Sequence, residues 1–337
     1  MTIRTPVSLG RFYSADADLL AAQVDACYSH PLGPGLHYDN DSLATFAVEP
    51  LALIVPHGAL GHAGPIAAHA YQRLAAWGTK RLLSQPLLVI LGPDHFGYGA
   101  PVSATSQDYA SPFGVIPTDQ TILNELYLKA VKHGQAAALR DAPAGHNSEH
   151  SVENQLPFIQ RLIEKRHLSP SVRILPLTMA AQDVVTALSL SRVLDQILPQ
   201  QDVILIATSD MAHCGAIYRN LPTENEGSLD ISGWCRIQAF NTIQAICSLS
   251  AHELIACHSK KNLSLCGAGC VATALAFSQL RGATRCQLLS MSDSVAVANG
   301  WHQIMGSSSN SGQDIDCETL QLVDTLNPVC FAAFVID

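Results

Sequence analysis

The stretch LALIVPHGALGHAG, residues 51–64, joins an apolar run to a glycine-rich turn that carries two histidines. Its first five residues are of the kind that form a strand buried on both faces of a sheet. The run ends at Pro56, and His57 follows at once. An imidazole at the end of a buried strand, beside glycines that permit close backbone approach, predicts a binding site at that strand end.

Two further apolar runs repeat this arrangement. The run 87–91 is followed by Asp94 and His95, and the run 203–207 is followed by Asp210 and His213. Ligands bind outside the carboxyl ends of the strands in open α/β sheets, so we expect these side chains to converge. The spacing of Asp210 and His213 predicts one helical turn after the strand, with both side chains on one side.

The segments between these strands have helical spacing of apolar residues, which predicts an α/β fold with helices on both faces of the sheet. No linker divides the chain, so we expect one domain over residues 1–337. The segment 148–170 has helical spacing of apolar residues and is expected to kink or restart at Pro157. The other expected elements are helices at 64–78, 119–134, 181–198, 234–247, 250–257 and 267–280, strands at 171–179, 286–294 and 330–337, and a polar loop at 306–314.

The composition excludes several classes of protein. Apolar residues make up 48% and charged residues 14% of the chain, which is typical of a globular protein with a large core. A net charge of −9 with only 19 Lys and Arg argues against nucleic-acid or anionic-membrane partners. The N-terminus does not resemble a signal peptide, and no apolar run is long enough to cross a bilayer. We therefore expect a cytoplasmic protein.

Cysteine spacing predicts neither a disulfide scaffold nor a zinc finger. The ten cysteines include no C-x-x-C pair, so most are expected to be reduced core thiols. Cys266 is distinct because it directly precedes a glycine-rich helix start, where a thiol is available as a ligand or nucleophile. A second polar cluster, in HNSEHSVENQLPF, contains Glu149 and His150. His62, His69 and His146 receive no assignment.

Several motifs together are similar to those of the Memo family, called AmmeMemoRadiSam system protein B in prokaryotes. They are VPHGALGHAGPIAAHAY, LGPDH, EHSVENQLPF, TSDMAH and LCGAG, in this order, and the resemblance also covers GRFYSADADLL and CFAAFVI near the two ends. It implies the LigB-like fold of class III extradiol dioxygenases, with a central mixed sheet. It further implies an iron or copper ion held by His57, His95 and Cys266, with His150, Asp210 and His213 in the same pocket as catalytic residues.

Two departures from the family pattern lie next to the implied site. Leu60 stands where the family commonly has tyrosine, and Cys214 stands where an aromatic residue is usual. Both changes concern the shape of the pocket more than metal binding.

Three functions remain open from the sequence. A metal-dependent redox or dioxygenase-like enzyme would use Fe(II) or copper, and the thiolate ligand favours Cu(I). A metal-binding protein without turnover, or a scaffold with a vestigial pocket, would carry the same motifs. The family name implies radical-SAM and Amme-domain proteins as partners in a modification system. A purely structural interpretation also exists, with His57 bonded to a backbone carbonyl and Asp210 or Glu149 capping a helix.

Overall fold

A mixed sheet forms the centre of the protein. The computed structural model describes residues 2–35, 48–82, 84–132, 139–222, 230–261, 263–305 and 326–337; the expected loop at 306–314 lies outside these ranges. Within them, nine strands form one sheet. In spatial order they are β10 (Ala212–His213), β12 (Val329–Ile336), β2 (Ala52–Val55), β9 (Val203–Thr208), β3 (Leu87–Pro93), β8 (Arg173–Met179), β4 (Val102–Ala104) and β7 (Leu139–Asp141), with β11 (Cys286–Asp293) paired to β12.

The middle of the sheet is parallel and its flanks are partly antiparallel. β2 pairs with β9, β9 with β3 and β3 with β8, all in parallel register. β12 pairs antiparallel with β2, and β4 pairs antiparallel with β8. Every residue of β2, β3 and β9 is buried, as expected for strands covered on both faces. The prediction of a mixed α/β architecture is confirmed.

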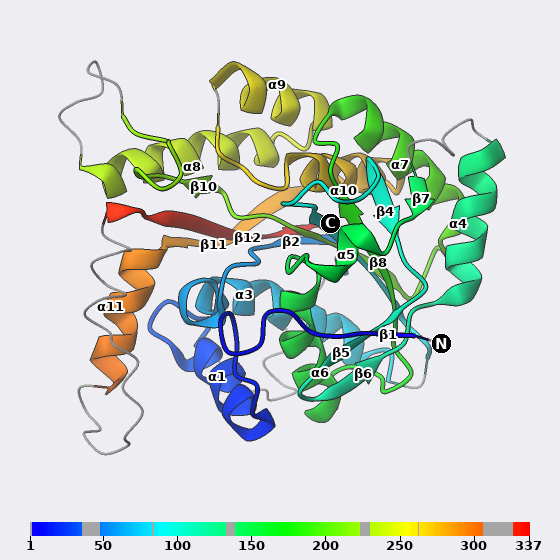
Figure 1. Cartoon of the computed structure of the whole chain (residues 1–337), viewed down its shortest axis with the longest axis horizontal. Helices are drawn as coiled ribbons and strands as arrows, with labels where there is room; N and C mark the ends of the chain where they lie inside the picture. Colours follow the sequence, from blue (N-terminus) through cyan, green and yellow to red (C-terminus); the bar gives the residue numbers. More distant parts are fainter. Residues whose placement is uncertain are drawn as a thin grey trace.

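Helices cover both faces of this sheet (Figure 1). Their apolar side chains form two hydrophobic clusters, one on each side. One face is covered by α4 (Gln120–Lys132), α7 (Val184–Ile197), α8 (Ile231–Cys247), α9 (Ala251–Lys261) and α10 (Ala268–Leu280), and the other by α1 (Ala17–Ser29), α3 (Leu60–Thr79) and α6 (Leu156–Glu164). Helix α11 (Ser294–Met305) lies beside α3. None of the helices in the described ranges has the length and apolar character needed for a bilayer crossing.

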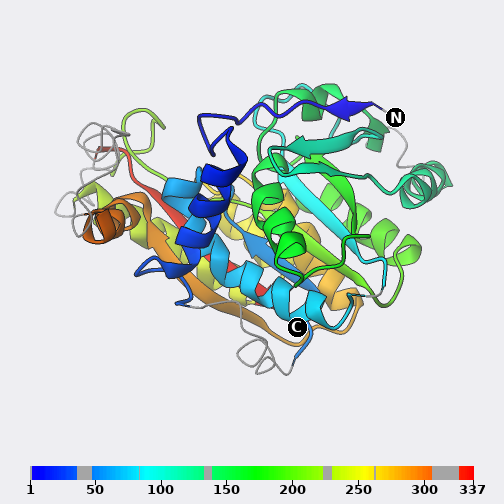
Figure 2. The same cartoon turned by 90° about the horizontal axis from the view of Figure 1, so that it is seen from below.

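The N-terminal segment packs against the second face through a small sheet. β1 (Ile3–Arg4), β5 (Asp108–Ser111) and β6 (Gly114–Ile116) form this three-stranded sheet, which Figure 2 shows beside α6. Two short helices, α5 (Ala144–Asn147) and the 3-10 helix η1 (Glu153–Gln155), lead from β7 into α6. Pro157 lies in the first turn of α6, where a missing N–H costs no helical bond, so the predicted restart is confirmed.

The predicted helical turn at 210–213 is wrong. Ala212 and His213 form the short strand β10, which pairs antiparallel with β12. The Met211 N–H donates to the carbonyl of Cys330 at 2.8 Å, so pairing with the last strand outcompetes a local helical bond. Asp210 and His213 still reach the same side, because the chain turns at the strand end.

Candidate metal centre

The site lies at the carboxyl ends of three adjacent parallel strands. β2, β3 and β9 each end two residues before a polar side chain, namely His57, His95 and Asp210. Because β9 lies between β2 and β3, these residues meet at one edge of the sheet. Each strand carries an unbroken apolar run that fixes its position, so the polar residues behind it are placed by the core.

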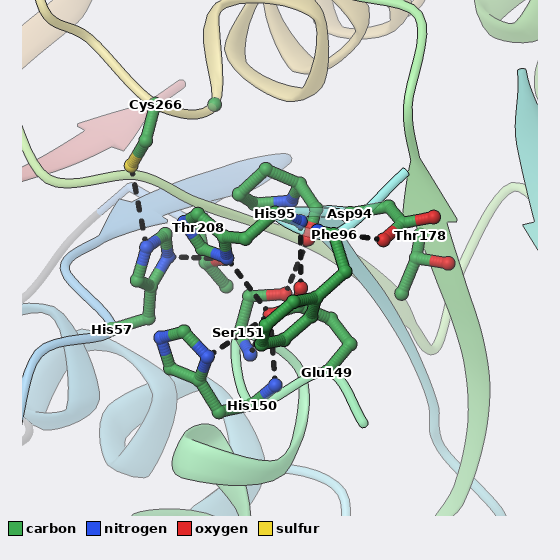
Figure 3. Close-up of polar contacts among 12 residues, drawn as sticks. His57, Asp94, His95, Phe96, Glu149, His150, Ser151, Thr178, Thr208 and Cys266 are labelled. Atoms are coloured by element: carbon green, nitrogen blue, oxygen red, sulfur yellow. Dashed lines mark hydrogen bonds and ion pairs between the residues drawn. The ribbon is translucent and has the colours of Figure 1, made fainter. Parts of the chain in front are cut away.

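Cys266 is far from His57 and His95 in the sequence, but its side chain lies at the same edge of the sheet. Its Sγ lies 3.3 Å from Nε2 of His57, and the His57 and His95 ring centroids are 5.0 Å apart at an interplanar angle of 83°. Figure 3 shows the sulfur directed toward the His57 ring. The turn approaches closely because Gly267 has no side chain: a Cβ there would collide with the carbonyl oxygen of Thr208.

The possible ligand atoms form two overlapping groups. In the part of the chain that the structure describes, His57, His95 and His150 have ligand atoms within 4.8 Å of one another, and so do His57, Asp210 and Cys266. His57 belongs to both. The trio implied by the family resemblance therefore spans the two groups. The structure brings its members together, while their role as ligands stays a prediction.

The imidazoles are anchored through Nδ1. That atom of His57 lies 2.9 Å from the Thr208 hydroxyl, that of His95 lies 3.0 Å from Glu149, and that of His213 lies 3.1 Å from the carbonyl of Ser264. A carboxylate or carbonyl oxygen only accepts, so Nδ1 of His95 and His213 carries the proton, and Nε2 is left for another partner. A metal-bound histidine in proteins is usually oriented in this way.

Glu149 organises one side of the site. Its carboxylate is almost completely buried and accepts from the backbone N–H of His95 at 2.7 Å and of Ser151 at 2.8 Å. The same carboxylate lies 3.3 Å from Nδ1 of His150. The His95 and His150 rings consequently stack, with centroids 4.7 Å apart and planes 15° apart. No sequence pattern indicated that one carboxylate would hold both rings.

The pKa values of His57 and His95 are shifted in opposite directions. Burial holds the pKa of His57 well below its usual value, so this ring is neutral and can act as a ligand. Burial also lowers the pKa of His95, but hydrogen bonding to Cys266 and Glu149 outweighs it and raises the pKa to about 10. Surroundings that stabilise a proton on His95 also favour a metal cation in its place.

The sulfur of Cys266 has a backbone donor beside it and also lies 3.7 Å from the carbonyl of Asp210, to which its thiol can donate. The backbone N–H of Asp210 donates to it at 3.2 Å, and the Ser209 hydroxyl lies 3.6 Å away. A set of two imidazoles and a thiolate is one that copper, iron and zinc accept, so the donor chemistry of the site fits a transition-metal ion.

A cavity of about 410 Å³ opens beside these atoms, within the size range of small-molecule sites. His150, Asp210 and His213 line it, together with His57 and His95. Oδ2 of Asp210 lies 3.9 Å from Nε2 of His57 and 3.8 Å from Nε2 of His213, while Oδ1 accepts the backbone N–H of His57 at 3.0 Å.

The two departures from the family pattern do not line this cavity. Leu60 is 6% exposed and packs into the core as the first residue of α3. Cys214 is fully buried in the other hydrophobic cluster. Among the unassigned histidines, His62 does line the cavity, whereas His146 is buried and bonded to Tyr109 and Ser103. Thr208 and Arg11, the latter at the cavity wall, were missed because neither has a distinctive motif.

Fold and site together define an α/β protein with a candidate metal centre at its strand ends. The Memo-like protein family model matches residues 4–309, and the chain therefore belongs to that family. MEMO1 family proteins of Thermococcus kodakarensis and Methanopyrus kandleri are 30% and 29% identical over 90% of the chain, with 97% and 96% of their own lengths covered. An uncharacterized protein of Escherichia coli K12 aligns at a TM-score of 0.44 and 10% identity, over 72% of this chain and 93% of that one, which is too distant to inform the site.

Proposed function

We propose that the protein is a metal-dependent oxidoreductase that holds one iron or copper ion through His57, His95 and Cys266. The observation that carries the proposal is the 3.3 Å approach of the Cys266 sulfur to Nε2 of His57, whose other nitrogen is already held by Thr208. These two atoms lie within hydrogen-bond distance beside the cavity, and a cation that replaces the proton between them would gain both as ligands.

A bound iron or copper ion would supply a Lewis acid and a one-electron redox centre. The chain's own residues provide the rest. Glu149 and Thr208 fix the ring orientations, and the cavity admits a small molecule beside the ligands. Nε2 of His213 lies 3.8 Å from the Asp210 carboxylate, and Nδ1 of His150 is positioned by Glu149, so both rings are placed at the cavity wall to transfer protons.

Elemental analysis of the purified protein tests the metal site. We expect about one equivalent of iron or copper in the wild type and its loss in His57→Ala, His95→Ala and Cys266→Ala. His252→Ala and Cys247→Ser are matched controls, because both side chains are exposed on other elements. These two variants should keep the metal. A Cys266→Ala protein with full metal content would contradict the ligand assignment.

Oxygen uptake tests the enzymatic part. With the metal loaded anaerobically and a panel of catechols then supplied with O2, we expect uptake by the wild type and a loss of about 10²-fold or more in Asp210→Asn and His213→Gln. If metal is retained and no catechol is consumed, metal binding without turnover replaces the oxidoreductase proposal.

A role as scaffold would instead be supported if the triple variant of His57, His95 and Cys266 bound radical-SAM and Amme-domain partners normally. These partners and the cytoplasmic location stay predictions.

A further inference from the structure

A rigid N-terminal turn brings a guanidinium to the cavity. Gly10, at φ 72°, donates its N–H to the carbonyl of Tyr13 at 2.8 Å, which closes a tight turn around Arg11. The Tyr13 hydroxyl donates to the buried carboxylate of Glu153 at 2.7 Å, and the N–H of Leu60 donates to the carbonyl of Phe12 at 2.9 Å. The backbone of Arg11 is therefore fixed, while its exposed side chain lines the cavity.

The charge of Arg11 has no counter-charge in the described structure. Within the described ranges, no carboxylate forms an ion pair with its guanidinium. The carboxylate that lines the same cavity, Asp210, already accepts the His57 N–H and faces the ring of His213. A guanidinium at a cavity of ligand size favours an anionic ligand, and its planar fork matches a carboxylate.

The wall next to Arg11 is aromatic. The Phe12 ring lies 4.6 Å from the ring of His150, and Phe331, which is 3% exposed, lines the same cavity. Gly58 leaves room for Phe331, since a Cβ at that position would lie 3.1 Å from the edge of the ring. Flat apolar walls beside an unpaired cation suit a ligand with a planar ring and a negative charge.

We propose that the cavity takes a small planar carboxylate, with its anionic group paired to Arg11 and its ring against Phe12 and Phe331. The proposal rests on the proposed function, because it identifies the ligand class of the same cavity. Arg11 acts as a specificity-determining residue that selects charge at one end of the ligand. The other end then faces the histidines of the candidate metal centre.

Benzoate and its neutral isostere benzamide test this selection by ligand-observed NMR titration. We expect benzoate to bind the wild type more tightly than benzamide. Arg11→Gln should weaken benzoate about tenfold, equivalent to about 1.4 kcal/mol, and leave benzamide within about twofold. Arg11→Lys should retain part of the preference. Arg192→Gln is the matched control, since this exposed arginine lies on α7, outside the cavity wall.

Equal benzoate affinity in the wild type and Arg11→Gln would overturn the inference, and so would the absence of any preference of the wild type for benzoate. The titration is run on the protein as purified and again after treatment with a chelator. A benzoate preference that disappears with the metal, and not with Arg11→Gln, also overturns it. Metal content is measured separately. If the protein as purified holds no iron or copper and Arg11 still selects benzoate, the proposed function alone is contradicted.

Discussion

At the scale of single residues, Glu149 is the group on which the orientation of the site depends most. It holds Nδ1 of His95 and approaches that of His150, and its own pKa, which burial would raise, is lowered to about 2, chiefly by its contacts with His95. Glu149→Gln keeps the shape and removes the charge. We expect its metal affinity to fall about 10- to 100-fold, as for other residues that orient a ligand.

A competition titration against a chromophoric chelator measures that affinity. Glu164→Gln, on the surface at the end of α6, is the control and should bind metal as the wild type does. An affinity of Glu149→Gln within twofold of the wild type would show that the His95 ring needs no carboxylate behind it.

His146 predicts a dependence of stability on pH. Burial is the main cause that lowers its pKa to about 3 in the folded protein, where the Tyr109 hydroxyl donates to Nδ1 and the ring N–H donates to the Ser103 carbonyl. An unfolded chain takes up a proton on this residue below pH about 6.5, whereas the folded protein does not. Stability should therefore fall as the pH drops below 6.5, by about 1.4 kcal/mol per unit from this residue.

His146→Gln can keep both hydrogen bonds and cannot titrate. Between pH 6 and pH 4, its free energy of unfolding in urea should decline less steeply than that of the wild type. His57, also neutral when folded, contributes to both slopes and cancels in the comparison. Parallel pH profiles for the two proteins would contradict the assignment of His146.

At the scale of elements, an ion pair and hydrogen bonds hold the N-terminal segment against the loop that carries Glu149 and His150. Arg4, with Nη1 2.6 Å from the carboxylate of Glu153, also donates to the backbone carbonyls of His146 and Glu149. Both charged side chains are almost completely buried. Replacing one partner of such an ion pair with a neutral residue leaves the buried charge of the other uncompensated.

Glu153→Gln should therefore lower the free energy of unfolding by about 3–5 kcal/mol. Urea unfolding measures the loss, and Lys80→Gln, in an exposed pair with Glu49, should change stability by no more than about 0.5 kcal/mol. If Glu153→Gln proves as mild as Lys80→Gln, the segment is not held by this pair.

Elements placed by burial were predictable, and those placed by pairing or by single contacts were not. The strand predicted at 87–91 became β3, and the helix predicted at 267–280 became α10, because unbroken apolar runs leave few alternatives. The turn at 210–213 was mispredicted because its partner, β12, lies far along the chain. The histidines could be found from their position after buried strands. Nothing local showed that Glu149 would bridge two of them.

At the scale of the whole molecule, the candidate site connects three segments that are distant in sequence. His57, His95 and Cys266 come from the ends of β2 and β3 and from the turn before α10. An unfolded chain does not present them together, so an ion that binds this set stabilises the folded state in proportion to the logarithm of its free concentration. At 100 times the Kd, the gain is about 2.7 kcal/mol.

Anaerobic thermal unfolding with Fe(II) added in steps measures this gain. The Tm of the wild type and of Cys247→Ser should rise together, and a chelator should reverse the rise. Cys266→Ala should show little increase, because it lacks the proposed ligand from the C-terminal half of the chain. An equal rise in Cys266→Ala would mean that the ion binds elsewhere, since removal of the sulfur nearest to His57 would then have had no effect on the folded state.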